Sequence, residues 1–143
     1  MQTYFVGRSR AIALGATLAF CAPAVTLADN AKAFRTVEKV SELSAIGAKQ
    51  LPGASIEQIF TSGTLINPDW TWDIEPDGTQ TSKANNGSWS DEGTWEVRGN
   101  EFCRASTLSQ GKTLCSKVYY LGRELRFSED ADPRNLLDWY VTY

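Results

Sequence analysis

The sequence of 143 residues contains no histidine. Without an imidazole the chain lacks the usual general base of serine and cysteine nucleophile systems, and it lacks the commonest ligand of zinc and copper sites. Any catalysis would therefore depend on carboxylates. We predict a protein that is not an enzyme and that carries no cofactor and no metal ion.

Long hydrophobic runs are missing as well. The single apolar stretch near the N-terminus is interrupted by Pro23, and it is shorter than the ~20 residues that span a bilayer. Arg8 and Arg10 precede this stretch and small residues follow it, an order typical of a secretory signal peptide. We predict that residues 1–28 are a cleavable signal, that the mature chain begins at Asp29, and that it contains no transmembrane segment.

Cysteines are scarce, since the chain has only three and one of them lies within the predicted signal. Signal removal leaves Cys103 and Cys115, which we expect to form a disulfide in an oxidising location, either periplasmic or secreted. The alternative is a lipoprotein anchored through Cys21. Phe20 argues against this alternative, because a small residue is preferred before a lipidated cysteine.

The chain also lacks an excess of positive charge. Residues 1–28 hold two of the 14 Lys and Arg and none of the 17 Asp and Glu, so the expected mature chain has a net charge of −5. An acidic surface offers no basic patch for phosphates. We therefore exclude nucleic acid as a partner.

The part of the chain that remains is rich in short β-prone runs separated by turn residues. We predict a mainly β fold, a small antiparallel meander curled as a barrel or sandwich, with a short N-terminal helix. Residues 29–50 are expected to be a leader, either helical or ordered only by contact with the domain. Residues 51–143 are expected to be a single β-rich domain that opens with a helix over 51–63. The predicted strands are 70–74, 79–83, 93–98, 101–106, 113–121, 123–128 and 136–143.

The expected disulfide sets the register of one hairpin. If Cys103 lies opposite Cys115, the chain turns at residues 109–111, and side-chain alternation places Phe102 and Val118 on one face. That face is the better candidate for the core. The disulfide then lies on the other face, near the surface.

Five tryptophans are the most distinctive feature of so short a chain. Most of them are expected in the core, but Trp70 and Trp89 lie nearest to predicted turns and are candidate ligand-facing residues. Asp73 and Glu75 alternate with tryptophans along one predicted strand. We expect these two acids to face solvent, and a catalytic carboxylate pair is the weaker alternative.

Several short segments occur in a characteristic order along the chain, at 47–64, 76–79, 93–97, 100–103 and 115–119. Together they resemble domain-of-unknown-function family 995, a group of small exported proteins of Gram-negative bacteria. The resemblance spans about 47–121 and does not extend to the ending 132–143. It implies a periplasmic or secreted β-domain with a short leading helix and a cysteine pair, and it carries over no catalytic residue.

These observations favour an exported, non-enzymatic binding module of the bacterial cell envelope. Its expected partner is an envelope protein, a glycan or a small apolar ligand. One alternative is a protein inhibitor of a secreted hydrolase such as lysozyme, with the loop 107–112 inserted in the active site of the hydrolase. The other alternative is a glycan hydrolase that uses Asp73 and Glu75.

Overall fold

The computed structural model describes residues 26–129 and 132–143, so the predicted signal up to residue 25, with Cys21, lies outside the described residues. These residues contain three helical segments: α1 (Leu27–Thr36), the 3-10 helix η1 (Val40–Ile46) and α2 (Gly53–Phe60). The strands are β1 (Lys49–Gln50), β2 (Thr64–Ile66), β3 (Trp70–Ile74), β4 (Thr79–Ala84), β5 (Ser90–Arg98), β6 (Glu101–Ser106), β7 (Leu114–Leu121), β8 (Glu124–Glu129) and β9 (Tyr140–Thr142).

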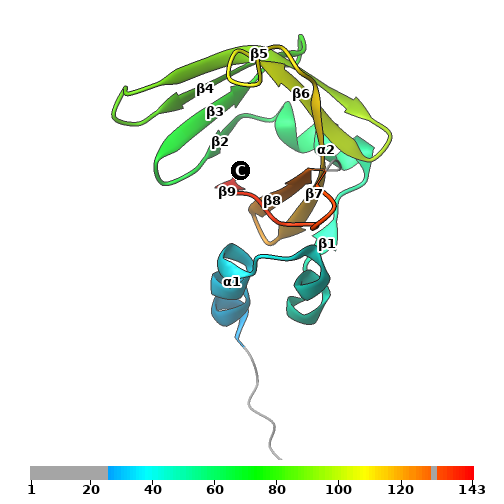
Figure 1. Ribbon diagram of the computed structural model, residues 1–143. Helices are drawn as coiled ribbons and strands as arrows, with labels where there is room; N and C mark the ends of the chain where they lie inside the picture. The colour runs from blue at the N-terminus through cyan, green and yellow to red at the C-terminus, as the bar shows by residue number, and fades with distance from the viewer. Residues whose placement is uncertain (1–25, 130–131) are drawn as a thin grey trace, which may run out of the picture.

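Strands β2 to β9 form a closed antiparallel barrel of eight strands (Figure 1). Consecutive strands from β2 to β8 pair as a meander, β9 then pairs with both β8 and β2, and this closes the ring. The short strand β1 adds to β7. The prediction of a mainly β antiparallel fold is confirmed, and the form is a barrel rather than a sandwich.

The inner faces of the strands follow the alternation of the sequence. In β3, Trp72 and Ile74 are buried in the barrel core, whereas Asp73 between them is only half-buried. Gly78 and Gly99 adopt φ values of 88° and 60° in the turns that follow β3 and β5. Glycine adopts this left-handed conformation without the penalty that a Cβ brings, so these hairpins can be tight.

Helix α2 fills one end of the barrel. Ile56 and Phe60 are fully buried, and the Phe60 ring packs edge-on against Phe102 with 4.7 Å between the ring centroids. The start of the helix touches the β5–β6 turn so closely that a Cβ on Gly53 would lie 2.0 Å from the Gly99 carbonyl oxygen. The helix predicted over 51–63 is thus present, and it closes the β5–β6 end.

Helices α1 and η1 cover the outer face of the barrel on the side of β7 and β8 (Figure 1). Phe34 and Leu43 pack there against Tyr119 in a second, smaller core. Arg126 on β8 faces this outer core and donates hydrogen bonds to the carbonyl oxygens of Phe34 and Val37, at the end of α1. The region 29–50 therefore packs against the strands instead of extending from them.

The C-terminal strand is much shorter than the predicted 136–143. Leu136 makes an isolated bridge to Lys39, and the Leu137 N–H donates to the Glu38 carbonyl, so this segment follows the outer helices before it enters the barrel. Only residues 140–142 pair as β9. The first half of the predicted strand is thus wrong, because contacts with a distant segment determine its path.

The register expected from the disulfide is confirmed. Cys103 lies opposite Cys115, and Phe102 opposite Ser116, with Phe102 and Val118 buried in the barrel core. The sequence predicts this disulfide near the surface. This is wrong for Cys103, which is only 1% exposed. Side chains of the neighbouring strands cover it on the outside of the barrel.

Candidate binding site

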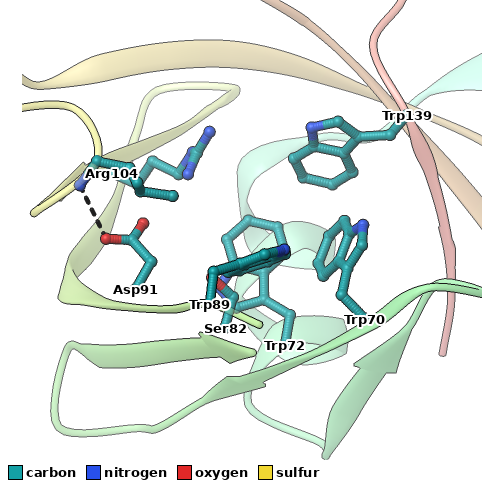
Figure 2. A pocket seen from close by; sticks show the side chains of 8 residues that line it. Trp70, Trp72, Ser82, Trp89, Asp91, Arg104 and Trp139 are labelled. Carbon is teal, nitrogen blue, oxygen red and sulfur yellow. Dashed lines mark hydrogen bonds between the residues drawn. The ribbon is translucent and has the colours of Figure 1, made fainter. Parts of the chain in front are cut away.

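A cavity of about 240 Å³ opens at the end of the barrel opposite α2 (Figure 2). Its wall includes Trp89 from the β4–β5 turn and Leu108 from the β6–β7 loop. Turns of an antiparallel meander alternate between the two ends, so these two connections lie away from the β5–β6 turn that α2 covers. We call this cavity the tryptophan pocket. Its lining consists of Trp70, Trp72, Trp89, Trp139, Ser82, Asp91, Arg104 and Leu108.

The strand registers bring part of this lining together. Trp72 on β3 pairs with Ser82 on β4, which pairs in turn with Asp91 on β5. All three side chains are buried on the inner face, and Trp70 lies two residues before Trp72 on the same face. Side chains two apart in a strand share a face, so one row across three strands forms the floor and one wall of the pocket.

Four of the five tryptophans form a continuous aromatic surface from floor to rim. Trp72 is buried at the floor, and its indole N–H donates to the Gln80 side-chain oxygen. The Trp70 and Trp139 rings meet at 89° with 4.7 Å between centroids. The Trp89 ring lies next, with 6.4 Å between its centroid and that of Trp70, and Trp89 is 39% exposed at the mouth of the pocket. Indole surfaces are therefore available to an entering molecule at several depths.

Arg104 brings a positive charge into this aromatic setting. Its guanidinium carbon lies 5.7 Å from the centroid of the Trp72 ring and 5.9 Å from that of Trp139. Indole faces attract cations, which offsets part of the cost of removing the charge from water. Among the described residues, no carboxylate oxygen lies within 4.0 Å of an Arg104 nitrogen. The charge thus forms no direct ion pair, and it interacts with the carboxylates of Asp91 and Asp138 from beyond that distance.

Asp91 is a buried carboxylate with one occupied and one unoccupied oxygen. Oδ1 accepts hydrogen bonds from the Thr107 hydroxyl at 2.5 Å and from the Leu108 N–H at 2.9 Å, and the latter is drawn in Figure 2. Oδ2 is buried and has no hydrogen-bond partner. Burial raises the pKa of Asp91, but the contacts with Thr107 and Leu108, the Ser106 hydroxyl and the positive charge of Arg104 outweigh it, so the pKa lies below its usual value. Asp91 is therefore ionised at neutral pH.

The structure places both candidate ligand-facing residues, Trp70 and Trp89, on the wall of one pocket. Sequence reasoning missed Trp139, which follows an irregular segment, and it missed the polar members of the lining. One sequence feature could have indicated Arg104. It alternates with Phe102 on the predicted core face of its strand, where a charge needs a reason to be present.

Asp73 and Glu75 lie elsewhere, in a shallow hollow beside the end of α2 that shares no lining residue with the tryptophan pocket. Asp73 accepts a hydrogen bond from the Thr64 hydroxyl at 2.7 Å and lies 3.7 Å from the Lys83 ammonium. Glu75 is exposed. The contacts of Asp73 are those of a carboxylate that pairs neighbouring strands on the outer surface.

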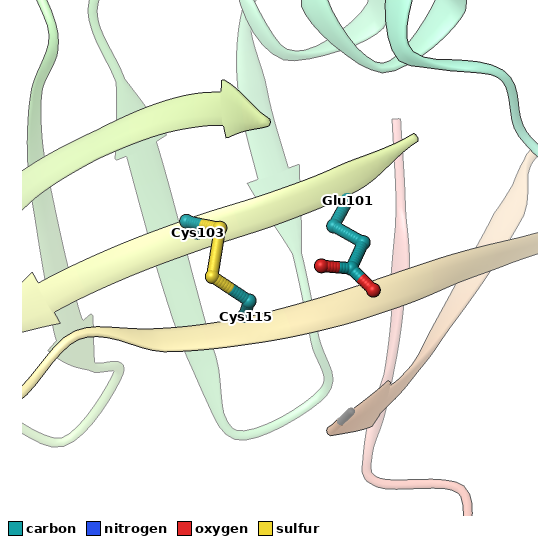
Figure 3. Close-up of side chains that lie close together, drawn as sticks. All are labelled: Glu101, Cys103 and Cys115. Atoms are coloured by element: carbon teal, nitrogen blue, oxygen red, sulfur yellow. A yellow bond between two sulfur atoms is a disulfide. The ribbon is translucent and has the colours of Figure 1, made fainter. Parts of the chain in front are cut away.

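A second cluster of potential ligands surrounds the disulfide. The Glu101 carboxylate and the sulfurs of Cys103 and Cys115 lie within 4.8 Å of one another (Figure 3). Metal ions bind cysteine as the thiolate, and both sulfurs are joined to each other here. The three side chains therefore cannot act together as a metal site while the disulfide is intact.

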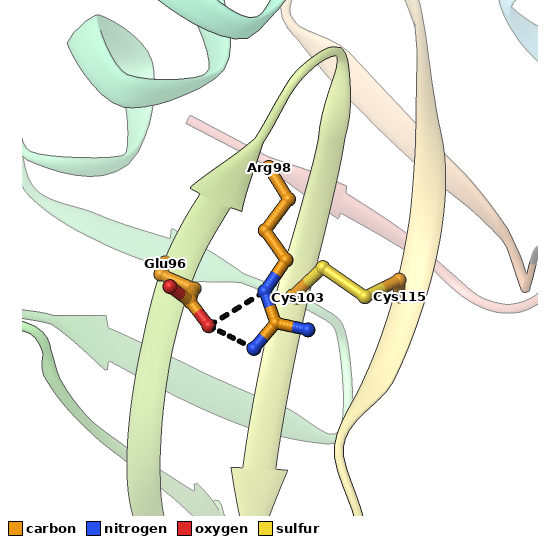
Figure 4. Close-up of a disulfide and its surroundings, with 4 residues drawn as sticks. All are labelled: Glu96, Arg98, Cys103 and Cys115. Carbon is orange, nitrogen blue, oxygen red and sulfur yellow. Dashed lines mark hydrogen bonds and ion pairs between the residues drawn. A yellow bond between two sulfur atoms is a disulfide. The ribbon is translucent and has the colours of Figure 1, made fainter.

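The outer side of the disulfide is covered by an ion pair. Arg98 donates a hydrogen bond to the Glu96 carboxylate, with 2.8 Å between Arg98 Nε and Glu96 Oε1. Figure 4 shows the Arg98 guanidinium beside the two sulfurs. Glu96 is also the cross-strand partner of Cys103. This cover explains the low exposure of Cys103, and it leaves the disulfide in a structural role at the base of the β6–β7 loop.

Comparison with protein-family models, with characterised proteins and with solved structures finds no match to this chain. Within the part of the chain that the structure describes, every helix is too short or too polar to cross a bilayer.

Proposed function

We propose that the protein is an exported, non-enzymatic binding module of the bacterial cell envelope whose ligand occupies the tryptophan pocket. One observation carries the proposal. Four of the five tryptophans converge on a single open cavity together with a cation that forms no direct ion pair among the described residues and a carboxylate oxygen that lacks a hydrogen bond. Mostly apolar cavities with a few convergent polar groups are the usual form of small-ligand sites.

The chemistry of the lining supports binding over catalysis. Glycosidic hydrolysis in most enzymes needs two carboxyl groups about 5–9.5 Å apart, and the lining of this pocket contains one, Asp91. Arg104 carries a guanidinium group, which donates hydrogen bonds and has no acceptor for a proton. The lining holds no histidine or lysine that could activate the Ser82 hydroxyl, and the pKa of its cross-strand neighbour Asp91 is lowered, which makes that carboxylate a weak base. The same residues are well suited to hold a molecule by stacking, charge and hydrogen bonds.

The test is a titration followed by tryptophan fluorescence. The probes are solubilised peptidoglycan fragments, neutral and acidic monosaccharides and aromatic acids, added one at a time to the purified protein. We expect a saturable change in emission with at least one probe, reduced at least tenfold in affinity by Trp70→Ala and by Trp89→Ala. Ile66→Ala is the matched control, because Ile66 is exposed and lies outside the pocket. No saturable response in the whole panel, or an equal response in Trp89→Ala, contradicts the proposal.

A second candidate function is inhibition of a secreted hydrolase such as lysozyme through the loop 107–112. The supporting observation is that Leu108 is 68% exposed although its backbone N–H donates a hydrogen bond to the Asp91 carboxylate. A braced loop with an apolar tip is suited to enter the active site of another protein. Inhibition of lysozyme that Leu108→Asp abolishes would support this function, whereas the absence of inhibition by the unaltered protein excludes it for this enzyme.

A further inference from the structure

Resting on the proposed function, we infer that the ligand of the tryptophan pocket is a single acidic pyranose, a sugar ring that carries a carboxylate. The ring would stack on the indoles, its carboxylate would pair with Arg104, and one of its hydroxyls would donate to Asp91. The free sugar acid and the terminal residue of an acidic glycan share this chemistry.

The size of the cavity limits the ligand to about one ring. Its volume of about 240 Å³ lies below the ~300–1,000 Å³ typical of sites for drug-sized molecules. The mouth is open, because Trp89 is 39% and Leu108 68% exposed at the rim. A longer glycan could therefore place its last residue inside and leave the remainder in solvent.

The aromatic surface suits the faces of a pyranose. Such a ring presents C–H groups on its faces and hydroxyls around its edge, and the electron-rich face of an indole attracts the slightly positive C–H groups. Trp70 and Trp139 offer two walls at right angles, with Trp89 as a third surface at the mouth. A flat aromatic ligand would stack as well, so the polar groups decide between the two classes.

Arg104 selects an anionic ligand. Its guanidinium is flanked by Trp72 and Trp139 and has no carboxylate within ion-pair distance among the described residues. A guanidinium presents a planar fork of N–H donors that matches the two oxygens of a carboxylate. The carboxylates of Asp91 and Asp138 attract Arg104 only from beyond ion-pair distance. A neutral sugar can accept a hydrogen bond from Arg104 but cannot form the direct ion pair that a carboxylate would form.

Asp91 selects a ligand that also carries a donor. Its Oδ2 is buried without a hydrogen-bond partner, and the Asp91 side chain belongs to the pocket wall. A hydroxyl of the ligand would supply the missing donor, with the hydroxyl of the paired Ser82 on the neighbouring strand as a second polar contact. A simple aromatic acid has no such donor, so it would leave this oxygen without a hydrogen bond. An acidic sugar satisfies both charged residues together.

Isothermal titration of the purified protein tests this inference. The probes are D-glucuronate, D-galacturonate and D-mannuronate, with D-glucose as the neutral sugar and benzoate as the aromatic acid. We expect at least one hexuronate to bind at least tenfold more tightly than glucose and benzoate. The methyl glycoside of that hexuronate distinguishes the two sources: retained affinity indicates the end of a glycan, and lost affinity indicates the free acid.

Substitutions of Arg104 test whether its positive charge binds the carboxylate of the ligand. We expect Arg104→Gln to weaken hexuronate binding to the level of glucose, and Arg104→Lys to give an intermediate affinity. Arg98→Gln is the matched control, because Arg98 lies on the outside of the neighbouring strand. Thermal unfolding of each variant reports whether the fold is retained.

Three results overturn the inference: no hexuronate binds, glucose binds as tightly as the hexuronates, or Arg104→Gln and Arg104→Lys both keep full hexuronate affinity while folded. If benzoate or glucose alone binds and Trp89→Ala removes that binding, the ligand class is wrong and the proposed function stands. The broader panel of probes decides the proposed function separately.

Discussion

Replacing Arg126 by methionine tests how the outer helices are held on the barrel. Arg126 is 6% exposed and donates to four carbonyl oxygens. Two of these belong to Phe34 and Val37 at the end of α1, at 2.9 and 2.6 Å. The other two belong to Leu137 and Asp138, at 3.0 and 2.8 Å. One side chain therefore ties α1 to the segment that leads into β9.

The size of the effect follows from these contacts. The last carbonyls of a helix have no partner within the helix, and burial lowers the pKa of Arg126 without removing its charge. Methionine keeps most of the apolar stem but donates no hydrogen bond. Leaving several buried acceptors unpaired costs about 3–5 kcal/mol, as for other broken buried charge contacts. This is a large share of the ~5–15 kcal/mol that stabilises a typical domain.

Urea unfolding followed by tryptophan fluorescence measures the loss, and trypsin cleavage at the exposed Lys39 reports whether α1 leaves the barrel. We expect Arg126→Met to lower the unfolding free energy by about 3–5 kcal/mol and to speed cleavage at Lys39. Arg123→Met is the control. The structure gives Arg123 a contact with the Tyr143 ring at 5.9 Å, so a loss under about 1 kcal/mol is expected. A loss of this small size in Arg126→Met, with unchanged cleavage, would refute the reasoning.

Three further predictions concern the stability of the barrel. The joint change Cys103→Ser and Cys115→Ser should lower the unfolding free energy by about 3 kcal/mol, as measured in urea, because the disulfide closes a short loop in the unfolded chain. Truncation before Leu136 should abolish cooperative thermal unfolding, since it removes β9 with the fully buried Val141 and leaves the barrel open between β2 and β8. Burial raises the Asp91 pKa but its hydrogen bonds lower it further. The stability that the Asp91 carboxylate contributes is therefore present above its unfolded pKa of about 3.9 and lost as the pH falls below that value. The difference in unfolding free energy between the unaltered protein and Asp91→Asn should accordingly shrink between pH 6 and pH 3, and a difference that grows would contradict this account.

Local patterns were sufficient to predict most of the meander. The register of the β6–β7 hairpin follows from placing Cys103 opposite Cys115 and from the two-residue alternation of side chains. The positions of Trp70 and Trp89 beside turns were enough to single them out as candidates for a ligand-facing surface. The register inference succeeds because it depends on residues that are neighbours in one hairpin, whereas a ligand-facing role of the two tryptophans stays a prediction.

Features that depend on distant segments could not be predicted in this way. Leu137 joins the outer core because residues 38 and 39 hold its segment, and no local pattern shows this. Trp139 enters the pocket only because that detour ends beside β3. The exclusion of solvent from Cys103 likewise depends on side chains of β5, the strand on its other side.

The position of the pocket follows from how the barrel interior is filled. An interior bounded by eight strands has room for side chains or for one small ligand, but not for both along its whole length. At the α2 end, Phe60 packs among Trp95 and Phe102 and occupies that space. Toward the other end the inner face carries Ser82 and Asp91, which are too small to reach across the barrel. Trp72 separates the two halves, since its ring contacts Phe60 on one side and forms the pocket floor on the other. A substitution of Trp72 would disturb the core and the site together, which is why the exposed Trp89 is the sharper test of binding.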